Sequence, residues 1–267
     1  MALKAAASAL KRIVSNVEVE RKFNPGPKFT SLFANHTSHA SHREKTPFAV
    51  RSHPGQLIRD TYYDTEDGHL GELGMWVRKR SVDVLPLNPA RLTARANDGA
   101  LWNAKLRLGG HFSNSLFVEF DGQSDVSREV LRITGAKTSL EDLRVVSDLQ
   151  TRRSEWEVTQ LADSTAPSAK MTIVVDAVTE AEAETEVGKY GIDEAAFNHL
   201  IGEVELFQEF VTEGKDDTEH EAHRKEIAAQ RMKELEEFML SHPDLFSTSP
   251  SPVGKLSAYE TWKAKRT

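Results

Sequence analysis

The chain contains no cysteine among its 267 residues. This absence excludes disulfide bonds, thiolate zinc sites and a cysteine nucleophile, and it suits a reducing compartment. No apolar run approaches the ~20 residues that a membrane-spanning helix needs, so we expect no membrane partner. Positive charge is not in excess either, because the formal net charge is -7. General affinity for nucleic acid is therefore not expected.

The composition is that of an ordinary globular protein, with 39% hydrophobic and 28% charged residues, and the length fits one large domain. The first sixteen residues contain Lys4, Lys11 and Arg12 and no acid. We interpret residues 1–16 as an N-terminal extension of a cytoplasmic protein, and a mitochondrial transit sequence is the alternative. Residues 17–267 are expected to form a single domain.

A short run near the start, residues 17–23, alternates between two kinds of side chain (VEVERKF). If the run is a β-strand, one face is largely apolar and the other carries Glu18, Glu20 and Lys22. A surface strand with its charges in water would explain this pattern alone. Later strands repeat the pattern, which favours a shared interior that these charged faces line.

The rest of the chain reads as a series of strands. Strand-like runs lie at residues 56–64, 75–80, 101–108, 116–120, 150–161, 169–178 and 200–207. Helical content is expected at residues 28–34, 126–133, 139–148, 217–240 and 256–265. Because the strands do not alternate with helices, roughly eight of them predict an α+β fold built on a mostly antiparallel sheet or barrel, with flanking and C-terminal helices.

Two segments are expected to be long loops, residues 35–56 and 82–99. The first contains His36, His39 and His42, whose spacing is compatible with a metal site. The segment is rich in serine and threonine and shows no supporting pattern, so a solvated loop is the favoured interpretation.

In a closed barrel, the charged strand faces would meet across the lumen. The basic side chains on these faces are Lys22, Arg78, Arg80, Lys105 and Arg153. The acidic ones are Glu18, Glu20, Glu119, Asp176, Glu203 and Glu205. The cations would attract a polyanion such as a phosphate chain, and carboxylates without histidine suit Mg²⁺ or Mn²⁺ better than Zn²⁺. Buried salt bridges alone would cost several kcal/mol of desolvation for each ion, so a ligand explains the set better.

The spacing of Glu18, Glu20 and Lys22 resembles the Glu-x-Glu-x-Lys hallmark of the CYTH superfamily, the triphosphate tunnel metalloenzymes. Further segments follow in the order of that family: RDTYYDT from residue 59, WVRKR from 76, WNAKLR from 102, FVEF around 119, TRRSEW from 151, VVDAV around 176 and GEVE from 202. The resemblance covers roughly residues 15–207. Within the superfamily, the sequences of these segments are most similar to those of animal thiamine triphosphatases. The loops at 35–56 and 82–99 are longer than that group leads us to expect.

The resemblance implies a closed barrel whose tunnel binds a triphosphate with a divalent metal, Mg²⁺ or Mn²⁺. The implied phosphate ligands are Lys22, Arg78, Arg80, Lys105, Arg153 and, near the C-terminus, Lys255. The implied metal ligands are Glu18, Glu20, Asp176, Glu203 and Glu205, with Glu119 supporting them. Trp76 is similar in position to a tryptophan that packs on the thiamine ring, which suits a cationic thiazolium.

These features predict a monomeric hydrolase that converts thiamine triphosphate to thiamine diphosphate and phosphate. Lys22 or Lys105 would act as general base if crowding by other cations lowers its pKa. The alternatives are an inorganic tripolyphosphatase, a nucleotide triphosphatase or cyclase, and a non-catalytic binder of polyphosphate. A scaffold protein using the charged helix at 217–240 is a further alternative, though such helices are usually just solvated.

Overall fold

The computed structural model describes residues 12–33, 47–85, 99–111, 114–159, 169–181, 196–213 and 217–266. Residues 1–11, the histidines at 36, 39 and 42, and residues 86–98 of the expected second loop lie outside these ranges. The expectations about a transit sequence and about a histidine metal site concern those segments.

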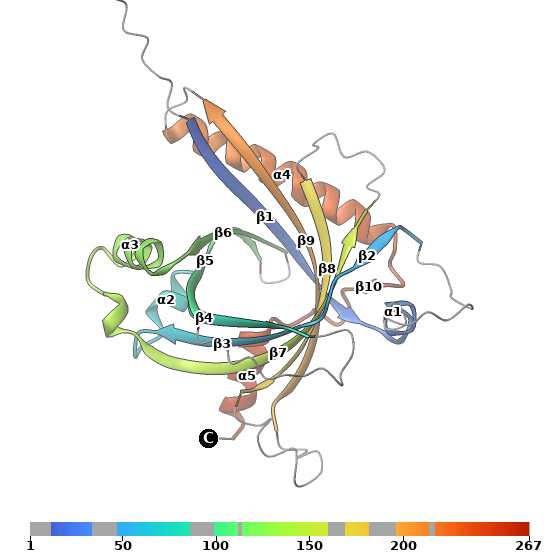
Figure 1. Ribbon diagram of the computed structural model, residues 1–267, viewed down its shortest axis with the longest axis horizontal. Helices are drawn as coiled ribbons and strands as arrows, with labels where there is room; N and C mark the ends of the chain where they lie inside the picture. The colour runs from blue at the N-terminus through green and yellow to red at the C-terminus, as the bar shows by residue number, and fades with distance from the viewer. Residues whose placement is uncertain are drawn as a thin grey trace, which may run out of the picture.

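Ten strands are present in the described residues (Figure 1). They are β1 (Arg12–Pro25), β2 (Val50–Ser52), β3 (Gln56–Asp64), β4 (Met75–Val84), β5 (Leu101–His111), β6 (Asn114–Asp121), β7 (Arg144–Val158), β8 (Ala169–Glu180), β9 (Asn198–Glu213) and β10 (Phe246–Ser247). Eight of them follow the order β1-β6-β5-β4-β3-β7-β8-β9, and antiparallel pairing of β1 with β9 closes the ring. The predicted closed antiparallel barrel in an α+β chain is confirmed.

The described residues also form five α-helices. They are α1 (Pro27–Phe33), α2 (His69–Glu72), α3 (Gln123–Ile133), α4 (Asp217–Leu240) and α5 (Lys255–Ala264). The long helix α4 runs along the outside of β1 and β9 (Figure 1). Within the described ranges, no helix has both the length and the apolar character that crossing a membrane requires.

The barrel is apolar on its outer face, where helices cover it. Val17, Val19 and Phe23 of β1 are buried in one cluster with residues of α1, α4, β8 and β9. Phe23 lies opposite Gly202 in the β1–β9 register, and a Cβ atom at Gly202 would come within 2.3 Å of its ring. The glycine of the GEVE segment is therefore required by this aromatic side chain. Because side chains alternate along a strand, burying these outward groups turns the charges of β1 inward.

The C-terminal helix α5 lies against the inside of the barrel wall. Its Tyr259 packs in a cluster with Tyr62, Leu149 and Val178 of β3, β7 and β8. These three positions alternate with the outward-facing residues of their strands. The start of α5 is thereby brought to the barrel interior.

Several sequence expectations differ from the structure. The expected loop at 35–56 contains β2 at Val50–Ser52, and β4 continues to Val84, inside the expected loop at 82–99. Residues 139–148 were expected to be helical, but only Leu140–Asp142 form a short 3₁₀ turn, and β7 begins at Arg144. Pairing of β7 with β3 reaches Asp64 opposite Arg144, so tertiary pairing overrides the local preference. In addition, β1 starts at Arg12 rather than residue 17, because its first residues already pair with β9.

Candidate active site

A cavity of about 260 Å³ lies inside the barrel and is lined mainly by charged residues. Every residue that we predicted to bind substrate or metal, except Asp176, contributes to its wall. The lining consists of Glu18, Glu20, Lys22, Tyr62, Trp76, Arg78, Arg80, Lys105, Ser115, Phe117, Glu119, Arg153, Glu203, Glu205 and residues 254–257. The strand alternation read from the sequence thus brings these side chains together, while their roles stay predictions.

Two of the lysines in the cavity, Lys22 and Lys105, are surrounded by carboxylates. Lys22 pairs with Glu20, and its Nζ lies 3.1 Å from Oε1 of Glu203. Nζ of Lys105 lies 3.0 Å from Glu18, 3.4 Å from Glu20 and 3.2 Å from Glu119. Both ammonium groups therefore have acids, rather than other cations, as their nearest charges.

This surrounding sets the protonation of the lysines. Burial alone would lower the pKa of Lys22, but Glu20 and Glu203 outweigh it and raise the pKa above its ordinary value. In the same way, carboxylates led by Glu18 overcome burial and raise the pKa of Lys105. The condition for a lysine general base, a pKa lowered by neighbouring cations, is therefore not met here. Both side chains are instead charged hydrogen-bond donors.

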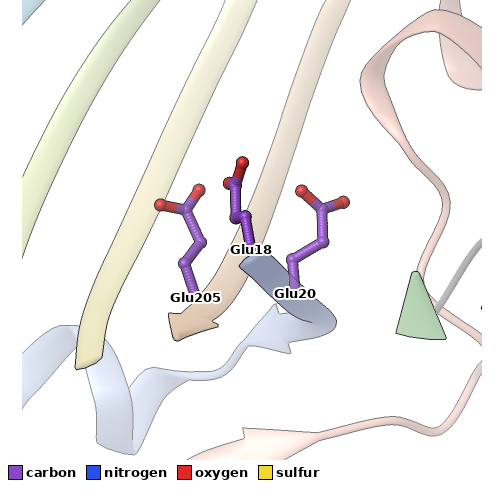
Figure 2. A group of neighbouring side chains, drawn as sticks. All are labelled: Glu18, Glu20 and Glu205. Carbon is purple, nitrogen blue, oxygen red and sulfur yellow. The ribbon is translucent and has the colours of Figure 1, made fainter. Parts of the chain in front are cut away.

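Three glutamates form a compact group of oxygen donors. Glu18 and Glu20 of β1 and Glu205 of β9 offer carboxylate oxygens that lie within 4.8 Å of one another. Figure 2 shows the three side chains rising from neighbouring strands toward the same side, and Glu20 is directly opposite Glu205 in the register. Such a set of hard oxygen donors without histidine fits a divalent cation such as Mg²⁺ or Mn²⁺.

The electrostatics of this group also fit a cation. Burial, together with repulsion from Glu18 and Glu203, raises the pKa of Glu205 to about 8 despite the attraction of Arg153. Burial likewise raises the pKa of Glu18, with repulsion from Glu119 and Glu20 adding to it against Lys105. The cations of the protein alone leave the negative charge of these two carboxylates only partly compensated.

The two remaining acids of the predicted metal set are engaged by basic side chains. Asp176 is 2% exposed and accepts hydrogen bonds from Nε and Nη2 of Arg153, both at 2.7 Å. The two residues lie opposite each other in the β7–β8 register. Glu203 is held by Lys22, and attraction by Lys22, Arg153 and Lys105 overcomes burial to lower its pKa to about 2. In this structure, Asp176 therefore orients Arg153 and does not belong to the three-glutamate group.

The structure adds a buried carboxylate that we did not single out, Asp60 of β3. Its oxygens accept hydrogen bonds from Nε and Nη2 of Arg80 at 2.7 and 2.8 Å and from Nζ of Lys255 at 3.1 Å. Nε of Arg78 lies 3.8 Å away and also donates to Asn103 at 2.7 Å. Burial would raise the pKa of Asp60, but Lys255, Arg78 and Arg80 hold it well below its usual range. The available sequence signal was its place in RDTYYDT, on the strand face shared with Tyr62.

An aromatic corner lies beside these charges. The ring of Trp76 meets the ring of Phe117 edge-on, with centroids 5.7 Å apart. The guanidinium carbon of Arg107 lies 5.6 Å from the Trp76 ring centroid. Trp76 is thus placed at the cavity, as predicted, but a cation of the protein is already stacked near it.

Comparison with known proteins gives no close relative. No family model matches the chain, and no curated protein matches it. Among solved structures, HpAC1 from Hippeastrum, described as a candidate adenylyl cyclase with a dominant triphosphatase activity, is 14% identical with a TM-score of 0.44, covering 94% of this chain and 96% of its own. A protein of Pyrococcus horikoshii is 13% identical with a TM-score of 0.35, covering 82% of this chain and 89% of its own. At these values, the likeness adds nothing to the strand pairing and the site geometry.

Proposed function

We propose that this chain is a metal-dependent hydrolase of the CYTH type that cleaves the terminal phosphoanhydride bond of a triphosphate, with thiamine triphosphate as the substrate. The observation that carries this proposal is the cavity itself, in which basic side chains and a three-carboxylate group face the same space. Basic side chains bind a phosphate chain, and a group of carboxylates binds a divalent cation.

The basic side chains would bind and orient the phosphate chain. Arg78, Arg80 and Lys255 approach the cavity from β4 and α5, while Lys22, Lys105 and Arg153 approach it from β1, β5 and β7. Because Lys22 and Lys105 are held protonated, they would donate hydrogen bonds to phosphate oxygens and stabilise the charge that develops on them in the transition state.

Glu18, Glu20 and Glu205 would hold the divalent cation, Mg²⁺ or Mn²⁺. When bound, such an ion supplies a Lewis acid and lowers the pKa of a coordinated water. The barrel would keep the three carboxylates close together in an enclosed cavity. Enclosure would strengthen their electrostatic interaction with the bound cation.

Trp76 supports thiamine as the organic group, since an indole ring attracts a cationic thiazolium. A second candidate substrate is inorganic tripolyphosphate. Arg107 favours it, because a guanidinium 5.6 Å from the Trp76 centroid would repel a second cation near the same ring.

The test is phosphate release in the presence of Mg²⁺, measured side by side for thiamine triphosphate, tripolyphosphate and ATP with a chelator control. We expect release from thiamine triphosphate to be fastest and to stop on chelation. Preference for tripolyphosphate would favour the second candidate. Absence of metal-dependent release from all three substrates would refute hydrolysis.

A further inference from the structure

Asp60 joins three basic side chains that come from different parts of the chain. Its side chain is 0% exposed, and it binds Arg80 of β4 through two hydrogen bonds and Lys255 of α5 through one. Arg78, two residues before Arg80, lies near the same carboxylate at 3.8 Å. A single negative charge therefore orders three positive ones and cannot neutralise them, so a net positive charge remains at this side of the cavity.

The contact with Lys255 also fixes the start of a helix. Lys255 is the first residue of α5, and the next two residues, Leu256 and Ser257, line the cavity. Gly254 lies so near the opposite wall that a Cβ atom there would be 3.3 Å from Cε of Lys22. The chain thus crosses the cavity at this point, and the ion pair between Asp60 and Lys255 links that crossing to β3 and, through Asp60, to the arginines of β4.

We propose that Asp60 is a positioning residue that holds Arg78, Arg80 and the start of α5 in one arrangement for binding a phosphate chain. The inference rests on the proposed function, because the positioned cations are those that would bind the triphosphate. Asp60 does not touch the phosphates itself in this scheme, since its oxygens are occupied by the cations that it orients.

A purely electrostatic role would have the opposite consequence. If Asp60 only reduced the positive charge of the cavity, removing its charge would strengthen the binding of a polyanion. If Asp60 positions the cations, removing its charge would weaken that binding, because the two arginines and Lys255 would no longer converge. The sign of the change in affinity separates the two roles.

The first experiment is calorimetric titration of the full chain with tripolyphosphate in the presence of a chelator. We expect Asp60→Asn to raise the dissociation constant by about 100-fold, the cost of misplacing binding groups by roughly 1 Å. Asp60→Glu keeps the charge but shifts the carboxylate, and it should also bind more weakly than the unchanged protein. Equal or tighter binding by Asp60→Asn would overturn the proposal.

The matched control is Asp148→Asn. Asp148 of β7 forms a two-pronged ion pair with Arg59, the neighbour of Asp60 on β3, at 3.0 and 2.5 Å. Asp148 does not line the cavity. It therefore repeats the chemistry of the Asp60–Arg80 pair away from the site. Its affinity for tripolyphosphate should equal that of the unchanged protein, and an equal loss in both variants would overturn a specific role for Asp60.

The second experiment is amide hydrogen exchange along residues 255–264 without any ligand. Asp60→Asn should speed exchange in α5, and Lys255→Met, which leaves Asp60 and both arginines in place, should do the same. Unchanged exchange in both variants would overturn the proposal even if the protein hydrolyses triphosphates. Conversely, a failure of the unchanged protein to bind tripolyphosphate both with the chelator and with Mg²⁺ would refute the proposed function, while faster exchange would still support the role of Asp60 in holding α5.

Discussion

The two sides of the cavity have the same number of cations but differ in their acids. On one side, which we term the acidic half, Lys22, Lys105 and Arg153 contact five carboxylates, those of Glu18, Glu20, Asp176, Glu203 and Glu205. On the other, the basic half, Arg78, Arg80 and Lys255 share Asp60. Glu119 lies between them, 3.2 Å from Lys105 and 3.8 Å from Arg78.

The difference shows how one barrel can attract ions of both signs. The acidic half has more carboxylate than cation, and burial together with repulsion between the carboxylates raises the pKa of Glu205 and Glu18. The basic half has more cation than carboxylate, and the lowered pKa of Asp60 reflects the reverse. A divalent cation bound to a phosphate chain is complementary to this division, which is why we favour that ligand over a bare anion or a bare metal.

The largest expected effect comes from removing one charge of the acidic half. Glu20→Gln takes a carboxylate from the three-glutamate group and from both lysines. We expect kcat/KM for the triphosphate to fall roughly 1000-fold, the upper range for losing one transition-state contact. Steady-state kinetics with Mg²⁺ measures this, and Glu157→Gln, an ion-paired glutamate outside the cavity, is the control. Full activity in Glu20→Gln would place the metal elsewhere.

Removing a cation of the acidic half should unbalance it further. Lys22→Met removes the ammonium partner of Glu203 and leaves Glu20 with Lys105 alone, which we expect to lower the free energy of unfolding by about 3–5 kcal/mol in the metal-free protein. Urea unfolding with and without Mn²⁺ measures the loss. Mn²⁺ should restore part of the stability, because the freed carboxylates bind the ion more strongly. A variant that is as stable as the unchanged protein without metal would contradict this account of the lysine.

The basic half should determine part of the response to acid. The folded pKa of Asp60 lies below its unfolded value, so the unfolded state binds more protons as the pH falls. The stabilisation from Asp60 is present above about pH 4 and is lost as the pH falls toward its folded pKa. In urea unfolding between pH 6 and pH 2, Asp60→Asn should be less stable at pH 6 and should lose less stability on acidification. If the free energy of unfolding of Asp60→Asn and of the unchanged protein changed equally with pH, Asp60 would not contribute to the acid response.

The smallest effect is expected at the aromatic corner. Trp76→Ala should lower kcat/KM for thiamine triphosphate by about tenfold, within the range of a cation–π contact, and leave tripolyphosphate hydrolysis unchanged. Trp102→Ala is the matched control, since Trp102 lies under Lys79 and does not line the cavity. An equal loss with both substrates would assign Trp76 to packing against Phe117 rather than to the organic group.

Much of the fold could be predicted from alternation alone. The charged face of β1 and the helix at 217–240 required only local periodicity, and the helix has the expected bounds. Residues 144–148 were misassigned because their strand identity depends on pairing with β3, which is distant in the sequence. Local patterns thus identified the elements with a clear periodicity of their own. They did not identify a strand segment that forms only by pairing with a distant strand.

The site was predictable to a similar degree. The strand residues that we expected in the lumen, apart from Asp176, line the cavity, since the face of a strand follows from period two. The pairing of Asp176 with Arg153 and the role of Asp60 could not be predicted, because each depends on which strand or helix lies next to it. The pKa of Lys22 is raised by Glu20 of its own strand and by Glu203 of the paired strand β9, whereas the acids that raise the pKa of Lys105 all lie on other strands.

The contact between Asp60 and Lys255 joins residues 195 positions apart. Together with the closure of β1 on β9, it makes the cavity a product of contacts between residues far apart in the sequence. Such contacts form late and slowly, because loop-closure entropy must be overcome first. Tripolyphosphate binding should therefore appear only in the final phase of refolding, which makes it a direct kinetic probe of barrel closure.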